Sequence, residues 1–566
     1  MVVHTDSTKS SEKNDQFLVN HSDIIENYVT NSKIEKYECE MVMNKQIISA
    51  EGFNRMIGYV QKHLVIEETM NRESLDIRTE KSDFRVTITG KDNIGDYCKT
   101  NAIPFNGVTV LQKKRVKEFP PIIIDDYDIR LNVNSEITPD DEIKMEFING
   151  LRQKAKYYRY KKRYSFVDSK KTLRVDMTIV RSSLNKNAKN FIRSKTISNV
   201  EEFEVEIEVL PNNSAQSSVV VSSLLKITNE LLKENNDVKV LLSKTQENEL
   251  ITEYATLVDP NIDLEYLLKN KTQHFLRYQP ITLMKRNLLE PDVDVVSIQT
   301  DYSCTEKADG ERYLMFINNQ GLVYFINSRL KVFASGVKHP SMKSCLLDGE
   351  YITKGKLNTR LNLFMCFDCY LVQGKDIRTK LLSDRMNEID KVLKDLDIKS
   401  PMIKKKDFFY GSENIMIDIK KCFEKMVSVP YHTDGLIFTP VNLSPGALYK
   451  NDTSMRPFGG TWNRVFKWKP PEENTIDVLV KFGEECIVEN EHGVQQKTIY
   501  ADLFVAYRGS VESTINVLDI YNDVVNQNKK KDQNQVINRL YDFTYLPIDG
   551  NSKHPLTTFT KEPILT

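Results

Sequence analysis

The sequence predicts an α+β protein whose N-terminal part is an antiparallel β-barrel or sandwich. Between about residues 33 and 210, short runs that alternate apolar and polar residues recur between turn residues, a pattern typical of those folds. Residues 218–257 then show the apolar spacing of a helix. From 258 to 470 strand-like runs return together with a helix, which predicts a second, mixed domain.

The length of 566 residues exceeds what one hydrophobic core supports, so we expect several domains. "KWKPP" at 467–471 marks a boundary because proline ends regular structure. The expected division is a disordered lead-in over 1–20, a strand-rich domain over 21–217, a helical linker over 218–257, a mixed domain over 258–470 and a last domain over 471–566.

Individual elements follow from the same patterns. In the first domain we expect strands over 36–43, 83–90, 107–119, 127–137, 157–166, 173–181 and 202–210. In the second we expect strands over 310–318, 321–328, 346–352, 361–372 and 433–440, with a helix over 383–396. In the last we expect strands over 475–483 and 498–509 and a helix over 514–531.

The bulk composition limits the function classes. Lys+Arg and Asp+Glu number 79 each, so any binding of nucleic acid must come from local patches. Cys366 and Cys369 form the one CxxC motif, and without a second pair at zinc-site spacing they are expected to be reduced core thiols rather than zinc ligands. Residues 1–20 lack the apolar run of a secretory signal, and no segment approaches the ~20 apolar residues of a membrane span.

Two runs place carboxylates at every second position of an expected strand. "YECEM" holds Glu38 and Glu40, and "FEVEIEV" holds Glu204, Glu206 and Glu208 with apolar residues between them. Alternate side chains of a strand share a face, so each run has one acidic face. One such strand alone is usually half-exposed, with its glutamates in water. The other possibility is that the acidic face lines the lumen of a barrel.

Basic residues in the same domain favour the lumen. "YYRYKKRYSF" places Arg159, Lys161 and Arg163 on one strand face, and "LRVDMTIV" places Arg174, Asp176 and Thr178 on another. Clustered carboxylates repel one another and are costly to desolvate, and a divalent cation with oxygen ligands relieves that cost. Phosphate is the matching anion for the basic residues. A metal ion and cations around a phosphate suit phosphoryl transfer to water.

ExE, RxKxR and ExExE, in that order, resemble the metal-dependent tunnel-type RNA triphosphatases of fungi, poxviruses and giant viruses. The resemblance implies a β-barrel tunnel over most of 33–210, with Glu38, Glu40, Glu206 and Glu208 as catalytic ligands of Mg²⁺ or Mn²⁺ and Glu204 nearby. It implies triphosphate binding by Arg159, Lys161 and Arg163, with Asp176 either supporting the metal ligands or orienting water. Shorter matches add Arg85, Lys114 and Glu136, although Arg85 and Lys114 could equally lie on a solvated strand face.

The stretch "TEKADGERYLMF", residues 305–316, raises a second chemistry. A lysine near a turn is more often a surface charge, but acids and cations recur downstream: Glu350 in "LLDGEY", Asp368 in "FMCFDCY", Asp434 in "HTDGLIF", and Lys467 and Lys469 in "FKWKP". A lysine nucleophile needs neighbouring cations or a metal to favour its neutral amine, and basic residues to hold the phosphates it attacks. The set therefore predicts attack by Lys307 on a nucleotide α-phosphate, releasing pyrophosphate.

Order and spacing resemble the covalent nucleotidyltransferases, namely mRNA guanylyltransferases and DNA or RNA ligases. "KADGER" and "WNRVFKWKPPEE" look most like capping guanylyltransferases of giant viruses and poxviruses, in which a tunnel triphosphatase precedes the transferase. The resemblance implies that GTP is the substrate and that GMP is carried on Lys307. The nucleotide-binding residues that it implies are Glu306, Asp309, Gly310, Arg312, Arg329, Glu350, Asp368, Asp434, Lys467 and Lys469.

One departure concerns the last domain. The family ends in an OB-fold with a basic RxDK-type motif, and no such string follows Lys469, so we expect an incomplete OB-fold and a cap methyltransferase either beyond residue 566 or on another chain. The expected function is mRNA cap synthesis on 5′-triphosphate and 5′-diphosphate RNA ends, with a viral RNA polymerase as a further partner and the viral factory of the host cytoplasm, or the virion, as location. An ATP-dependent polynucleotide ligase would leave the glutamate strands unexplained. A non-catalytic polymerase-associated scaffold would leave both charge constellations unexplained.

Overall fold

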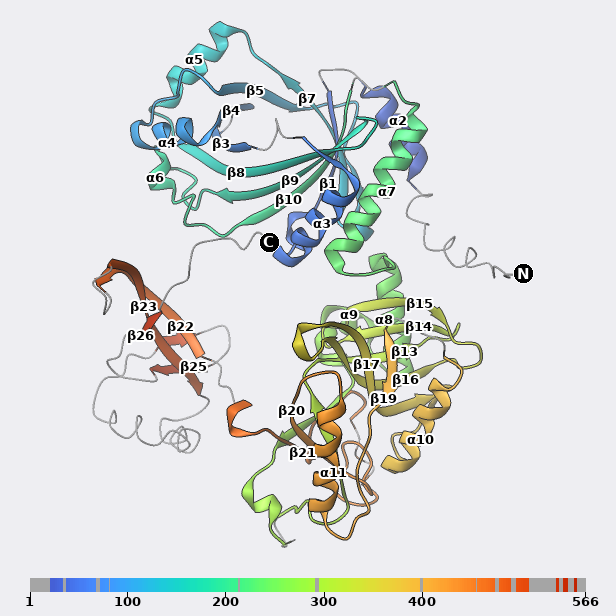
Figure 1. Ribbon diagram of the computed structural model, residues 1–566. Helices are drawn as coiled ribbons and strands as arrows, with labels where there is room; N and C mark the ends of the chain where they lie inside the picture. Colours follow the sequence, from blue (N-terminus) through green and yellow to red (C-terminus); the bar gives the residue numbers. More distant parts are fainter. Residues whose placement is uncertain are drawn as a thin grey trace. The chain divides into compact units, whose positions relative to one another are not determined.

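A computed structural model describes most of the chain (Figure 1). The described residues are 21–33, 37–67, 72–80, 82–211, 214–290, 295–396, 401–452, 454, 456–473, 478–489, 495–507, 536–538, 543–547 and 554–556. The expected lead-in over 1–20 and the expected helix over 514–531 lie outside them. The chain divides into two compact units, residues 1–468 and 469–566.

Among the described residues of the first unit, eight antiparallel strands close into a barrel, which confirms the expected α+β class and N-terminal barrel. The strand order is β1-β10-β9-β8-β3-β4-β5-β7, and β7 pairs back with β1. The strands are β1 (Tyr37–Met43), β3 (Arg72–Thr79), β4 (Phe84–Thr89), β5 (Val108–Arg115), β7 (Ile129–Ile137), β8 (Lys156–Val167), β9 (Leu173–Ser182) and β10 (Glu202–Val209). Two short strands, β2 (Val65–Ile66) and β6 (Ile122–Ile124), extend the edges of β8 and β7.

The barrel is apolar outside and charged inside. Helices α2 (Ser22–Asn31), α3 (Ala50–His63) and α7 (Ser217–Asn236) cover the outer faces of β1, β9 and β10, while α4 (Lys91–Thr100), α5 (Asp141–Leu151) and α6 (Phe191–Ser194) cover β3, β4 and β8 (Figure 1). Each strand therefore has an apolar face under a helix, and its alternate residues point into the lumen.

The expected linker over 218–257 forms two helices rather than one. α7 ends at Asp237, which adopts a left-handed conformation (φ 53°), and α8 (Lys244–Val258) begins with a capping box formed by Ser243 and Gln246. Leu224 and Leu231 of α7 pack in the barrel's outer core, whereas Tyr254 of α8 packs in the core of the next domain.

The second domain contains two sheets. One has the order β15-β14-β13-β16-β17-β18 with β19 beside β17, and the other has the order β11-β21-β20-β12. The first comprises β13 (Glu311–Ile317), β14 (Leu322–Asn327), β15 (Val332–Lys338), β16 (Cys345–Lys354), β17 (Arg360–Val372), β18 (Lys375–Asp376) and β19 (Met402–Lys405). The second comprises β11 (Arg277–Thr282), β12 (Tyr302–Ala308), β20 (Thr433–Pro440) and β21 (Gly459–Trp468).

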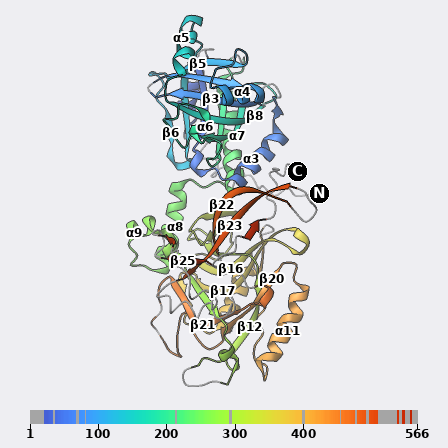
Figure 2. The same cartoon turned by 90° about the vertical axis from the view of Figure 1, so that its left-hand side faces the viewer.

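Helices cover these sheets. α9 (Leu264–Lys269) follows α8, and α10 (Leu382–Leu393) packs on β17. α11 (Ile415–Ser428) packs on β12, as Figure 2 shows. Among the described residues, no helix is both long and apolar enough to cross a membrane.

The second unit is an antiparallel sheet in which β26 and β25 both pair with β23. It comprises β22 (Val478–Glu489), β23 (Gln495–Tyr507), β24 (Val536–Asn538), β25 (Phe543–Pro547) and β26 (His554–Leu556). Its two longest strands overlap the strands expected over 475–483 and 498–509. The assignment of this unit to an incomplete OB-fold stays a prediction.

Candidate active sites

The glutamates predicted from the two alternating runs lie on two neighbouring strands, β1 and β10. β1 and β10 pair antiparallel with Glu40 opposite Glu208, and Glu206 lies opposite Asp176 of β9. Glu40 is only 6% exposed, and the amide of Asn134, on β7, donates to its Oε1 at 3.1 Å. The carboxylates predicted from the two alternating runs therefore share one region of the lumen.

The basic residues of β8 point into the lumen and pair with acidic residues of nearby strands. Arg159 pairs with Glu204, Lys161 Nζ lies 2.5 Å from Asp76 Oδ2, and Arg163 lies 2.9 Å from Asp176 Oδ2 and 3.4 Å from Glu206 Oε2. Asp76 lies on β3, a strand that the sequence did not reveal.

Two more cations complete the network. Arg174 lies 3.3 Å from Asp176 and also pairs with Glu208, while Arg85 lies 3.5 Å from Glu136. Each of these five cations of β8, β9 and β4 therefore has a carboxylate partner.

The prediction of Lys114 as a tunnel residue is wrong in its placement, because Lys114 lies on the outer face of β5. Its side chain is 53% exposed and lies 4.0 Å from Asp83, whereas Lys113 points inward. The Lys113 ammonium pairs with Glu38 and lies 3.7 Å from Glu40 and 3.5 Å from Glu136. A strand alternates faces, so an error of one residue exchanges the lumen for solvent.

Burial and like charge perturb the lumen carboxyls. Burial, reinforced by Glu206 and Glu38, raises the pKa of Glu40 to about 8. Burial also raises the pKa of Glu208 to about 7, although Arg174 opposes the shift. Burial alone would raise the pKa of Glu206, but Arg163 and the other lumen cations outweigh it and lower that pKa. Neighbouring carboxyls that resist ionising together are a suitable donor set for a divalent cation.

As they stand, however, no three His, Cys, Asp or Glu side chains of the described part of the chain converge closely enough to hold a metal ion. Lys113 lies among Glu38, Glu40 and Glu136 and supplies the positive charge there. Binding of a cation by Glu38, Glu40, Glu206 and Glu208 would therefore require the Lys113 side chain to move aside.

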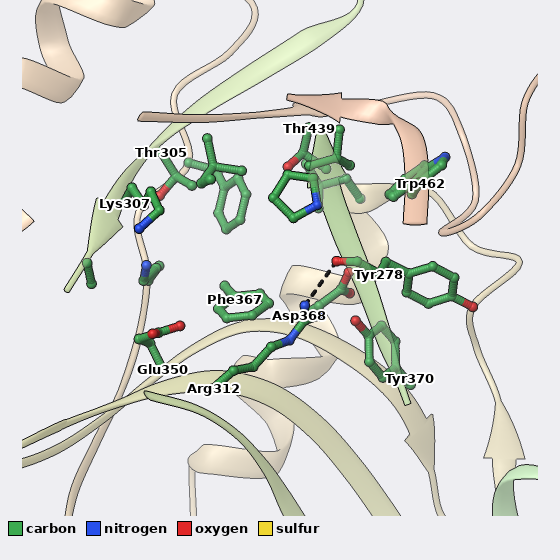
Figure 3. Close-up of a pocket in the computed structure, with 17 residues that line it drawn as sticks. Tyr278, Thr305, Lys307, Arg312, Glu350, Phe367, Asp368, Tyr370, Thr439 and Trp462 are labelled. Atoms are coloured by element: carbon green, nitrogen blue, oxygen red, sulfur yellow. Dashed lines mark hydrogen bonds between the residues drawn. The ribbon is translucent and has the colours of Figure 1, made fainter. Parts of the chain in front are cut away.

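The second site is a cavity of about 220 Å³ between the two sheets of the second domain. Lys307, near the end of β12, points into it, and its Nζ donates to both carboxylate oxygens of Asp434, at 2.7 and 2.8 Å. Figure 3 shows Lys307 and Glu350 at one end of the cavity and Trp462, Tyr278 and Tyr370 at the other. Burial raises the pKa of Glu350, opposed by Lys406, Arg312 and Lys307.

A buried network fixes Arg312 in the cavity wall. Its Nε donates to Asp348 Oδ1 at 3.0 Å, Nη2 donates to the other oxygen, and Nη1 donates to the carbonyl of Tyr278 at 3.0 Å (Figure 3). Tyr370 Oη donates to Asp348 as well, at 2.6 Å. Asp348 is fully buried and accepts from two nitrogens of Arg312. Its removal would therefore leave the Arg312 guanidinium without its bidentate partner.

Asp368 also lines the cavity, but its carboxylate is engaged. Nε and Nη2 of Arg385, a fully buried residue of α10, donate to its two oxygens at 2.7 and 3.1 Å. The pairing of β16 with β17 shifts register beside Asp368, so Phe367 is the extra residue of a bulge and its ring faces the cavity (Figure 3). Cys366 and Cys369, on either side of the bulge, are buried free thiols in the apolar core.

Two of the predicted nucleotide-binding residues that do not line the cavity also face away from it or lie in a distant turn. Glu306 lies between Thr305 and Lys307 on β12 and therefore faces the opposite side, where its carboxylate accepts from Tyr431 Oη at 2.9 Å. Arg329 is exposed in the turn between β14 and β15, because the strand ends two residues earlier. Both placements correct the sequence-based prediction.

The remaining predicted residues lie close to the cavity or in the second unit. Asp309 is exposed at the turn after β12, where its N–H donates to the carbonyl of His432 at 2.9 Å. Lys467 pairs in register with Ile437, which lines the cavity. Lys469 belongs to the second unit, and its role stays a prediction.

Sequence reasoning missed much of the cavity wall. The missed residues include Tyr278, Thr305, Phe367, Lys406, Ile437 and Trp462. Phe367 lies within 5.3 Å of the Arg312 guanidinium carbon and 5.6 Å of Lys406 Nζ, measured from its ring centroid. The one available signal was the aromatic residue directly before Asp368.

Gly310 has no room for a Cβ atom. A Cβ there would meet the carbonyl oxygen of Tyr351 at 2.7 Å and Glu350 Cγ at 2.8 Å. We expect Gly310→Ala to displace Glu350 and to cost about 1–3 kcal/mol of stability, as overpacking does. Thermal unfolding and covalent nucleotide labelling should both fall. Gly58→Ala in α3, which meets nothing within 4 Å, is the control, and equal behaviour of the two variants would contradict the steric argument.

The fold and geometry together present a charged tunnel and a separate cavity with a lysine, an arrangement whose side chains suit phosphate chemistry. Comparison with known proteins agrees, since residues 234–471 match the family "mRNA capping enzyme, catalytic domain". A probable mRNA-capping enzyme of Acanthamoeba polyphaga mimivirus is 26% identical over 483 residues, covering 72% of this chain and 37% of that protein. The African swine fever virus mRNA-capping enzyme is 25% identical over 213 residues, 37% of this chain and 22% of that protein.

Residues 234–471 are thus similar to the mRNA capping enzyme catalytic domain, and the chain is similar in sequence to viral mRNA-capping enzymes. The RNA triphosphatase domain of a mimivirus capping enzyme aligns over 38% of this chain and 97% of its own, at 22% identity and a TM-score of 0.28. The barrel assignment rests on the strand order rather than on that score. The chain spans about a third of the length of its mimivirus relative.

Proposed function

We propose that this chain performs two successive steps of mRNA 5′ cap synthesis. The tunnel removes the γ-phosphate of a 5′-triphosphate RNA, and the cavity transfers GMP from GTP to the resulting 5′-diphosphate end. The observation that carries the proposal is the position of Lys307, whose amine points into the cavity with Glu350 and Arg312 in the walls.

In the transferase step Lys307 Nζ attacks the α-phosphorus of GTP. A P–N bond forms, the bond to the bridging oxygen breaks, and pyrophosphate leaves. The amine must first lose a proton, and the Asp434 carboxylate, 2.7 Å from Nζ, is the adjacent acceptor. A terminal oxygen of the RNA diphosphate then attacks the same phosphorus, the P–N bond breaks, and GpppRNA results.

The cavity offers a place for the base as well as for the phosphates. Phe367 presents a ring face, and Ile437 lines the cavity too, so a planar base could stack between aromatic and aliphatic walls. Lys406, which is 5% exposed, lies beside the ring and donates to the carbonyl of Glu306 at 3.2 Å. A buried ammonium with donors to spare favours a base with a carbonyl oxygen, as guanine has.

In the tunnel, water attacks the γ-phosphorus and the bond to the β-phosphate oxygen breaks. Glu38, Glu40, Glu206 and Glu208 would hold Mg²⁺ or Mn²⁺, which when bound would offset charge on the phosphates. Arg159, Lys161 and Arg163 would bind the triphosphate oxygens, each held toward the lumen by its acidic partner. Asp176, anchored by Arg163 and Arg174, would orient the attacking water.

Lys113 and Lys114 form a matched pair that tests the tunnel. We expect Lys113→Ala to lower phosphate release from triphosphate RNA by roughly 10- to 100-fold, because it removes a cation beside the phosphates. Lys114→Ala, on the outer face, should retain full activity. A larger loss in the Lys114 variant would show that the triphosphate does not occupy the lumen.

The expected partners and location are part of this proposal. A cap methyltransferase and a viral RNA polymerase are the partners whose chemistry precedes or follows these steps, and a viral site in the host cytoplasm, with the virion as a further location, agrees with the viral relatives.

A further inference from the structure

A cationic loop lies at one rim of the barrel and is not used by either proposed reaction. It covers residues 183–200 of the connection between β9 and β10 and contains no Asp or Glu; the last residue of the connection, Glu201, pairs with Arg181. Four cations, Lys186, Lys189, Arg193 and Lys195, are exposed on it. Among the described residues none of the four has a carboxylate within ion-pair distance, in contrast with Arg159, Lys161, Arg163 and Arg174 of the lumen.

The loop is rigidly built, although it is long for a strand connection. Backbone N–H groups of Leu184 and Asn185 donate to the carbonyl of Ser194 at 3.1 Å, and Ser194 Oγ lies 2.6 Å from Thr196 Oγ1. On its underside Phe191 packs edge-on against Tyr158 of β8, with ring centroids 5.5 Å apart. The exposed cations therefore project from a pre-organised support, which lowers the entropy cost of binding.

The position of the loop continues the cation row of the tunnel. Arg163, Lys161 and Arg159 follow one another along β8 toward this rim, and Arg159 pairs in register with Ser182, the last residue of β9. Glu206 lies four residues after Glu202, the first residue of β10, so it is about 13 Å from this rim at the rise of a strand. The β3–β4 turn at the same rim, with Glu80, Lys81 and Asp83, has no net positive charge.

We propose that residues 183–200 bind the RNA chain that follows the 5′-triphosphate, holding the phosphates of its first nucleotides outside the tunnel. The inference rests on the proposed triphosphatase function and adds where the RNA enters. Lys186, Lys189, Arg193 and Lys195 contact backbone phosphates without reading sequence, and exposed Ile192 and Ile197 contact sugars or bases.

The test replaces the four cations by glutamine and compares two substrates, a 5′-triphosphate 20-mer RNA and a 5′-triphosphate dinucleotide too short to reach the loop. We expect KM for the 20-mer to rise about tenfold or more, its salt dependence to fall by a slope of about 2–3, and KM for the dinucleotide to stay unchanged. The control variant carries Lys62→Gln, Lys170→Gln, Lys171→Gln and Lys226→Gln, four exposed lysines away from this rim, and should match the wild type. Equal effects on both substrates, or none, would overturn the proposal.

Binding of a 5′-hydroxyl 20-mer, followed by fluorescence anisotropy, separates this inference from the proposed function. Weaker binding by the loop variant alone supports the loop even if the wild type releases no phosphate. The proposal would be overturned if the loop variant bound the RNA as well as the wild type does but no longer bound polyglutamate. That result would assign the surface to an acidic protein.

Discussion

Incubation of the protein with α-labelled GTP and Mg²⁺ will label the chain covalently, and Lys307→Ala will abolish the label. The loss should be complete within detection, because Lys307 is the proposed nucleophile and the P–N bond cannot form without its amine. The label should be stable to base and labile to acid, as expected for a phosphoamidate, and pyrophosphate should reverse it.

Lys307→Arg is the sharper variant. Arginine keeps a positive charge that can pair with Asp434, but it stays protonated and cannot attack phosphorus at neutral pH. We expect GTP binding to persist in this variant while labelling is lost, which separates nucleophile from counter-ion. Lys338→Ala, on β15, is the matched control and should label normally. Labelling by ATP alone would instead support a polynucleotide ligase.

Alternation along single strands was the most predictable feature of both sites. Glu38, Glu40, Glu206 and Glu208 reach the same lumen because apolar neighbours on both strands require the other face for the core. The one strand of the closed barrel that was missed entirely, β3, has only Leu75 and Ile77 as its apolar pair, too short a signal to stand out. The ion pair between Asp76 and Lys161 could therefore not be predicted from the sequence.

Errors arose where the local pattern does not fix the face. "LQKKRV" carries adjacent lysines, and only the pairing of Lys113 with Glu136 decides which one turns inward. Glu306 was carried over with its motif, yet pairing of β12 with β20 puts it on the core side. Arg385, which holds Asp368, lies on α10 and is brought there by packing, so no spacing rule connects the two.

Replacing Glu40 by glutamine will stop metal-dependent phosphate release from 5′-triphosphate RNA, with a fall of roughly 100-fold or more in kcat. Glutamine keeps the size of the side chain and can still accept from Asn134, so packing is preserved while one anionic oxygen donor is lost. Removal of the metal ion by a chelator should abolish phosphate release by the wild type, and added Mg²⁺ or Mn²⁺ should restore that activity.

Glu202→Gln supplies the matched control, because Glu202 lies on the same strand as Glu206 and Glu208 but pairs with Lys45 at 2.9 Å at the rim. That variant should retain phosphate release. The Glu40 variant should still form the covalent GMP adduct, since Lys307 lies in a different domain with its own core. Undiminished phosphate release by Glu40→Gln would remove the tunnel from the reaction, while loss of both activities together with a lowered Tm would reduce Glu40 to a structural residue.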